Sequence, residues 1–215
     1  MNVTPAYTQK FKNEEDQLAE KTALEKILDK SFSRHDARLL FNFFTTHAGR
    51  EIIADKEIGF TGAEKREFLL TAYKERILVP LKSVKGPAWE DKLVDFSDGG
   101  IYFVPSVVWP VIEILNQENR ICINRIIKKT IPELSIEDIT SVSQLLDTII
   151  IHSPHFIFEV GLLKLFYDQI GFIQGLHDII DLFVIRGMMS PCPRKSLITG
   201  LSWYEIHPVL FWTTP

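Results

Sequence analysis

The stretch TGAEKREFLLTAYKERILVP, residues 61–80, carries more information about the fold than any other part of the chain. Thr61 with Glu64 three positions later has the pattern of a capping box, so we predict a helix that begins here and runs to about residue 76. The apolar run at residues 77–79 includes Ile and Val, which favour extended backbone. The stretch therefore predicts a helix that leads directly into a short strand.

A second stretch, SDGGIYFVP at residues 97–105, predicts a hairpin. Two consecutive glycines are a turn signal, because glycine readily adopts the positive φ angles of tight hairpin turns. Residues 93–96 and 101–104 stand on either side of this turn and are the expected arms of a β-ribbon.

Helices are predicted to precede the ribbon. Residues 13–30 have the charge gradient and the apolar spacing of an amphipathic helix. A helix capped by Ser33 or Asp36, a short helix at residues 47–55 and the helix from Thr61 then follow in order. Three core helices followed by a ribbon are the layout of a winged helix-turn-helix domain, which we predict for residues 13–118 after a disordered arm at residues 1–12.

Residues 119–215 are predicted to form a second, mostly helical domain with one or two short strands. Ser135 begins a helix that runs to about residue 148, and the β-branched residues 149–151 favour a strand. Apolar helices are expected at residues 156–170 and 176–185. The tail from residue 190 is expected to be irregular, and no internal repeat is evident in the sequence. The predicted fold class is α+β.

Composition narrows the classes of function. The 215 residues are 46% hydrophobic and 24% charged, as in an ordinary globular protein. A formal net charge of -4 argues against a protein that coats nucleic acid, because phosphate binding requires an excess of Lys and Arg. Two cysteines and the absence of a leader pattern near Met1 lead us to expect a cytoplasmic protein. No uninterrupted apolar run of about 18 residues is present, so no membrane partner is expected.

The order of the segments resembles that of prokaryotic 4Fe-4S ferredoxin-type proteins with an N-terminal winged-helix region. The matching stretches are ARLLFNFF at 37–44, KERIL at 74–78 and GIYFVP at 100–105, with weaker matches at 123–131 and 183–188. The resemblance spans roughly residues 20–190. It implies a winged-helix fold and descent from proteins that hold an iron-sulfur cluster.

The chain departs from this family at the cluster ligands, which begin there with a Pro-Cys-x-Cys-Arg motif. Residues 153–158, SPHFIF, stand at the equivalent place without a cysteine, and residues 191–194, PCPR, have one thiol where two are needed. Since a [4Fe-4S] cluster usually takes four thiolate ligands, we expect this chain to have kept the scaffold without the cluster, and no cofactor is predicted.

Candidate DNA contacts follow from the winged-helix prediction. The helix from Thr61 would offer Lys65, Arg66 and Lys74, and the loop after it Lys82 and Lys85. Three glutamates on the same helix offset this positive charge, so we favour a docking or structural role over DNA binding for this domain. Duplex DNA and a protein partner both remain open.

Candidate metal ligands are His152, His155 and Cys192, since two close imidazoles and a thiolate could supply a tetrahedral zinc site, with His207 as a further candidate. The spacing is not specific, and Pro154 keeps the two histidines out of a regular helix. The plainer interpretation is one partly buried and one exposed histidine.

The preferred interpretation is a non-catalytic regulatory or interaction protein, with a transcriptional role among the candidates, whose second domain dimerises or senses a ligand. No catalytic motif is recognised, so we assign no catalytic residue and do not expect an enzyme. The apolar end of the chain, residues 203–212, is expected to pack on the body or on another subunit, which favours a homodimer. The alternative is a redox or metal-binding relative of the iron-sulfur group.

Overall fold

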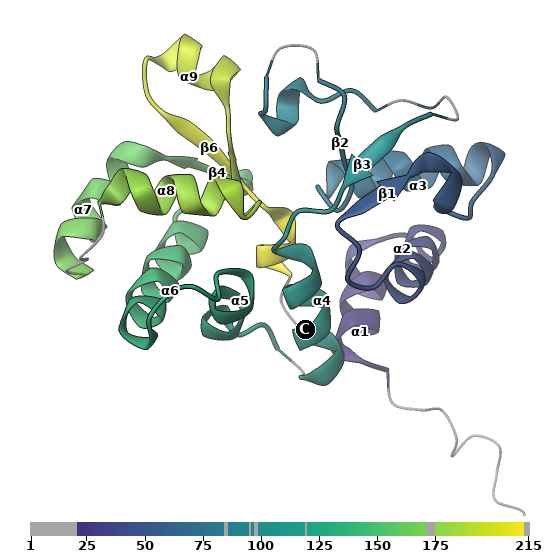
Figure 1. Ribbon diagram of the computed structural model, residues 1–215, viewed down its shortest axis with the longest axis horizontal. Helices are drawn as coiled ribbons and strands as arrows, with labels where there is room; N and C mark the ends of the chain where they lie inside the picture. The colour runs from purple at the N-terminus through teal and green to yellow at the C-terminus, as the bar shows by residue number, and fades with distance from the viewer. Residues whose placement is uncertain are drawn as a thin grey trace, which may run out of the picture.

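The computed structural model describes residues 21–83, 86–94, 96, 99–118, 120–170 and 175–212, apart from the side chains of residues 168–170. The disordered arm expected at residues 1–12 lies outside this part of the chain. The protein mixes helices with two small antiparallel sheets, as the α+β prediction requires (Figure 1).

The elements of the first half are α1 (Ala23–Ser31), α2 (Arg34–Thr46), β1 (Ile52–Ala54), the 3-10 turn η2 (Asp55–Glu57), α3 (Gly62–Lys74), β2 (Val79–Pro80), η3 (Trp89–Asp91), β3 (Ile101–Phe103) and α4 (Val108–Gln117). Those of the second half are α5 (Ile123–Thr130), α6 (Ile136–Ile151), η4 (Pro154–Phe156), β4 (Ile157–Glu159), α7 (Val160–Ile170), α8 (Leu176–Ile185), β5 (Met189–Pro191), α9 (Pro193–Thr199), β6 (Trp203–Ile206) and η5 (Pro208–Phe211). In Figure 1, α1, α2, α4, α5 and α6 lie below the two sheets, and α9 stands above the second sheet.

The two sheets have the same strand order. In the first, β3 lies between β1 and β2, so that Tyr102 stands opposite both Ile53 and Pro80. In the second, β6 lies between β4 and β5, and Tyr204 stands opposite both Phe158 and Pro191. Each sheet therefore places the last strand in the centre, with a tyrosine facing a proline on the strand that precedes it.

The helices before each sheet repeat as well. Ser33 begins α2 and Ser135 begins α6, and each serine Oγ accepts the backbone N–H of an aspartate three residues on, at 3.1 Å in both cases. Each of these helices leads to the first strand of its sheet. The second half thus repeats the order of the first, with α7 where the first half has the single turn η2.

The core is continuous across both halves. α4 lies at the centre of the molecule and contacts η5 (Figure 1). Trp212 is buried against the rings of Phe32 and Phe44, with centroids 6.0 and 6.3 Å away. Of the two alternatives expected for the apolar end of the chain, packing on the body and packing on another subunit, Trp212 shows the first.

Several predicted elements are wrong in type. Residues 47–55 contain strand β1 rather than a helix, because Ile53 pairs with Tyr102 in the sheet and is fully buried there. Among the described residues 93, 94, 96 and 101–104, the expected ribbon pairing is not found. β3 pairs instead with β1 and β2, while the Leu93 N–H donates to the Lys82 carbonyl.

The second half departs further from its prediction. α6 continues through residues 149–151, because Ile149 extends the buried stripe of Val142, Leu145 and Leu146 and so gains more as a helix than as a strand. The described residues of the second half contain three strands, where one or two were expected.

The tail from residue 190 is ordered into β5, α9, β6 and η5 rather than irregular. Its prolines stand where proline is tolerated: Pro191 is on an edge strand, Pro193 opens α9 and Pro208 opens η5. Among the described residues, no helix has both the length and the apolar character needed to cross a membrane.

Candidate functional site

The exposed row of α3 is the surface on which the sequence placed DNA contacts. Arg66, Leu70 and Lys74 are exposed there on successive turns of the helix. Lys65 points the other way, because its ammonium group pairs with the buried carboxylate of Asp55 at the start of η2. Lys82 is exposed after β2, and Lys85 lies outside the described residues.

Acidic side chains of α3 pair with basic side chains of α2. Glu64 accepts from Arg38 at 3.0 Å, and Glu67 lies 3.1 Å from His35. Leu70 lines a hollow of about 460 Å³ between the two helices, together with both polar and charged neighbours. The surface is therefore mixed in charge with an apolar residue at its centre, unlike the concentrated positive surface that phosphates require.

In the second half, α8 follows α7 as α3 follows η2, and its exposed side chains include His177, Asp178 and Asp181. Two carboxylates on one exposed face repel a phosphate backbone. α3 has three basic residues against two acidic ones, and α8 has two acidic residues and no Lys or Arg, so neither helix has the concentrated positive charge that phosphate binding requires.

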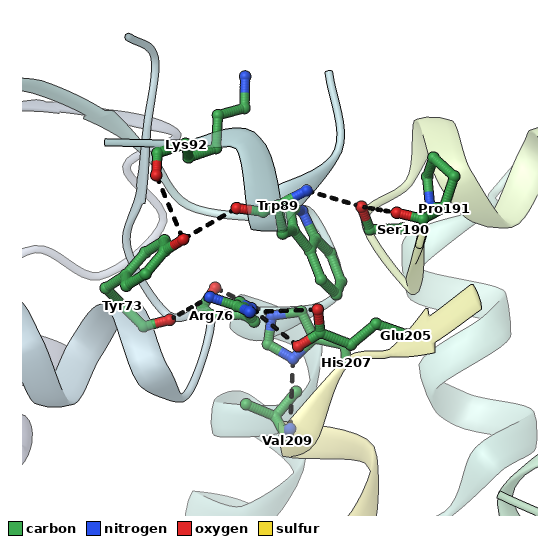
Figure 2. A network of polar contacts seen from close by, with 9 residues as sticks. All are labelled: Tyr73, Arg76, Trp89, Lys92, Ser190, Pro191, Glu205, His207 and Val209. Atoms are coloured by element: carbon green, nitrogen blue, oxygen red, sulfur yellow. Dashed lines mark hydrogen bonds and ion pairs between the residues drawn. The ribbon is translucent and has the colours of Figure 1, made fainter. Parts of the chain in front are cut away.

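A buried polar cluster joins the two halves, and its members come from both (Figure 2). Arg76, just after α3, donates from Nε and Nη2 to the two carboxylate oxygens of Glu205 on β6, at 2.9 and 3.1 Å. Only 14% of the Arg76 side chain and 18% of the Glu205 side chain are exposed. Burial lowers the pKa of Arg76, but the hydrogen bonds and charge of Glu205 outweigh it, so that the pKa lies above its ordinary value. Arg76 is therefore charged.

Aromatic residues surround this ion pair. The Arg76 guanidinium lies 4.6 Å from the centre of the Tyr73 ring and 6.0 Å from that of Trp89. The Tyr73 hydroxyl donates to the Trp89 carbonyl at 2.9 Å, and the Trp89 backbone N–H donates across the junction to Ser190 Oγ, also at 2.9 Å. The cluster therefore links α3 and η3 of the first half with β5 and β6 of the second, as Figure 2 shows.

His207 completes the cluster and is fully buried. The Val209 N–H donates to Nδ1 at 3.2 Å, so the proton of the neutral ring is on Nε2, which donates to the Arg76 carbonyl at 3.1 Å. Burial lowers the pKa of His207 to about 3. Because both ring nitrogens are already engaged, His207 holds the junction together and is unsuited to bind a metal.

The structure does not bring the candidate metal ligands together into one site. His152 caps the end of α6 and stacks on Phe166, with ring centroids 5.1 Å apart, while His155 is exposed in η4. Cys192 is buried at the start of α9, and burial, with the charges of Glu205 and Glu90, raises its pKa to about 11. Within the described part of the chain, no three His, Cys, Asp or Glu side chains gather in a way that could hold a metal ion.

The junction residues Arg76, Trp89, Ser190, Glu205 and His207 were not singled out from the sequence as a site. One signal was available, since Arg76 ends a helix at a position where glycine is common. Their meeting depends on contacts between residues more than 100 positions apart, which no local pattern reports.

Comparison with protein-family models, with curated proteins and with solved structures finds no match for this chain.

Proposed function

We propose that this chain is a non-catalytic regulatory or interaction protein built from two winged-helix units that are joined into one rigid body. The observation that carries the proposal is the order that both halves share, with α7 and α9 as additional helices of the second half: a capped helix, a strand, a further helix and two strands, with the last strand central. This order is that of a winged helix. A fold of this kind binds DNA or docks proteins, so the charge and polarity of the exposed surface must indicate which of the two functions applies.

The surface favours docking to a protein. The helix that a DNA-binding winged helix places in the major groove would be α3 in the first half and α8 in the second. On α3, Glu64 and Glu67 oppose Arg66 and Lys74, and on α8 the exposed charged side chains include two aspartates. Leu70 stands exposed at the centre of the α3 face, beside the hollow between α2 and α3. An apolar residue within a mixed-charge rim is typical of a protein interface.

Fluorescence anisotropy with a random-sequence duplex tests the choice between DNA and protein. In buffer of roughly 50 mM salt, where nonspecific affinity is strongest, we expect no saturable binding at protein concentrations up to about 10 µM. Saturable binding that weakens with salt, and that the double variant Arg66→Glu with Lys74→Glu abolishes, would assign the α3 face to DNA instead.

A photo-crosslinking residue in place of Leu70 tests the docking role in the native host. A discrete adduct is expected from this position, and the same substitution at Ile136, exposed at the start of α6, serves as the control. Equal labelling from both positions would contradict a docking role for the α3 face.

A further inference from the structure

The two halves of the protein enclose a hollow of about 400 Å³ beside the buried junction. η3 and the residues before it form one wall, and the start of α9 forms the other. Both elements stand at the top of Figure 1, above the two sheets. Small-molecule sites occur preferentially between structural units, and their volumes begin at roughly 300 Å³. The hollow therefore has the place and the size of a small-molecule site.

One wall of the hollow contains a buried carboxylate. Asp91 ends η3, lines the hollow and is only 7% exposed. Its backbone carbonyl accepts from Ser83 Oγ at 3.4 Å, but within the described part of the chain no hydrogen bond or ion pair to its carboxylate is found. A buried charge without a partner costs free energy, and native proteins normally give such a group a hydrogen bond or a counter-charge. Asp91 therefore points to a bound group that supplies both.

The opposite wall contains a guanidinium group. Arg194 is exposed in the first turn of α9 and also lines the hollow. Among the residues that the structure describes, its guanidinium makes no ion pair, either with Asp91 or with another carboxylate. Two opposite charges that share a hollow without contacting each other can be bridged by a ligand that carries one charge of each sign.

The other side chains of the lining are apolar. They come from both halves and are those of Pro87, Ala88, Pro191, Pro193 and Leu197. Leu197 is 87% exposed, so a ligand that covers it removes apolar surface from water. Proline and alanine side chains also lose almost no conformational entropy when a ligand binds. The lining therefore favours a ligand with an aliphatic body between its two charges and the solvent.

The two walls are held in place by hydrogen bonds that cross between the halves. The Trp89 backbone N–H donates to Ser190 Oγ at 2.9 Å (Figure 2). The Arg194 backbone N–H donates to the Glu90 carboxylate, also at 2.9 Å. The residues that flank Asp91 and the residue that carries the guanidinium are thus fixed before a ligand arrives, which reduces the entropy lost on binding.

We propose that this hollow binds a small zwitterion with an aliphatic body, of the class of amino acids and short peptides. The ligand's ammonium group donates to Asp91, its carboxylate accepts from Arg194, and its aliphatic part covers Leu197. Because the two charged residues belong to different halves, the bound ligand bridges the halves and stabilises the folded protein. The site uses no residue of the α3 face, so it stands or falls separately from the docking role of that face.

Isothermal titration calorimetry of the full chain with L-leucine and with the dipeptide leucyl-leucine tests the class of ligand. Saturable binding of at least one is expected at ligand concentrations up to about 10 mM, and the tighter of the two distinguishes a free amino acid from a peptide. Isoamylamine and 4-methylpentanoate each lack one of the charges and should bind at least about 10-fold more weakly. Failure of both zwitterions to bind, or equal binding of a compound with a single charge, would overturn the proposal.

Two variants with matched controls test the residues. Asp91→Asn and Arg194→Gln are each expected to weaken binding of the zwitterion by about 10-fold or more, since each removes a charge-assisted hydrogen bond. Asp181→Asn changes an exposed aspartate of α8, and Lys195→Gln changes the residue next to Arg194, whose ammonium lies over the Trp203 ring. Both controls should bind as the unchanged protein does. A loss of affinity as large in the controls would contradict the assignment.

Stability without ligand separates a binding role of Asp91 from a structural one. Because Asp91→Asn removes a buried charge that has no partner, its urea midpoint is expected to equal or exceed that of the unchanged protein. A structural carboxylate would give the opposite result. A lower midpoint together with lost binding would show that Asp91 supports the fold, and would overturn the proposal.

Discussion

Arg76 adopts a backbone conformation that usually belongs to glycine. Its φ angle is +58°, and Gly187 has a φ angle of +67° at the corresponding end of α8. A side chain in this left-handed region costs about 1 kcal/mol or more, and such strain persists where surrounding contacts determine it. Here the bidentate bond to Glu205 and the bond from His207 to the Arg76 carbonyl hold the residue in place. The strained residue therefore marks the junction of the halves.

Replacing Glu205 by Gln tests the ion pair at this residue. The change leaves a buried guanidinium without its counter-charge, which is expected to lower the free energy of unfolding by about 3 kcal/mol. Guanidinium chloride titration monitored by tryptophan fluorescence measures the loss. Asp29→Asn, which breaks the exposed pair of Asp29 with Lys21, should leave the midpoint unchanged, and an equal shift in both variants would refute the role of burial.

His207 makes the stability depend on pH in a defined window. The unfolded imidazole takes up a proton below about pH 6.5, whereas the buried ring does so only near pH 3. The unfolded state thus binds one more proton as the pH falls below 6.5, and the free energy of unfolding falls by about 1.4 kcal/mol per pH unit from this group. Urea titrations of the protein and of His207→Gln between pH 7 and pH 5, roughly, should show a shallower slope in the variant. Identical slopes would contradict a neutral buried His207.

Helix starts show how far local sequence reports local structure. The cap at Ser135 was predicted and is confirmed, because serine and the third residue of the helix suffice to form it. Thr61 does precede α3, but its side chain makes no cap bond, and the Glu64 carboxylate accepts from Arg38 on α2. Glu25 forms a full capping box with Thr22, so α1 begins at Ala23, while residues 13–20 of the helix predicted from residue 13 lie outside the described part of the chain. Contacts with other elements, which cannot be read from the local sequence, decide whether a predicted cap forms.

The two serine caps are expected to contribute equally to the free energy of unfolding. Ser33→Ala and Ser135→Ala each remove one bond to a backbone N–H at the start of a core helix, and each is expected to cost about 1 kcal/mol of unfolding free energy. Thermal unfolding of both single variants and of the double variant measures the two costs, which should add because the sites are far apart. A cost at one serine only would contradict the equivalence of α2 and α6.

Gly187 lies where the turn after α8 meets the first half. A Cβ atom built there would lie 2.6 Å from Pro105 Cβ and 3.1 Å from Pro105 Cα, so the two halves would have to separate. Gly187→Ala is expected to lower the free energy of unfolding by about 2 kcal/mol or more, the sum of the positive φ angle and the clash.

Gly49→Ala provides the comparison. Gly49 also has a positive φ angle, of +75°, but a Cβ atom there would meet nothing within 4 Å. It should therefore cost about 1 kcal/mol, from the backbone alone. Equal effects of the two substitutions in chemical denaturation would show that the approach of Gly187 to Pro105 does not matter.

The repeated order of elements in the two halves is not evident from the sequence. The corresponding residues are few and are separated by segments of unequal length: the serine caps, Pro80 with Pro191, and Tyr102 with Tyr204. They were therefore not recognised as a repeat, although α2, α3 and α8 were individually expected as helices. The strands were harder to predict, because each has four residues or fewer and its partners are distant in the chain. The exposed surfaces depend on how the two halves are assembled, so the sequence predicts them only in part.

Differential scanning calorimetry of the full chain tests most directly whether the two like halves form one body through the buried junction. The continuous core and the Arg76–Glu205 pair require both halves to unfold together, so we expect a single transition whose calorimetric enthalpy equals its van't Hoff enthalpy. Two resolved transitions, or a calorimetric enthalpy well above the van't Hoff value, would contradict a single body.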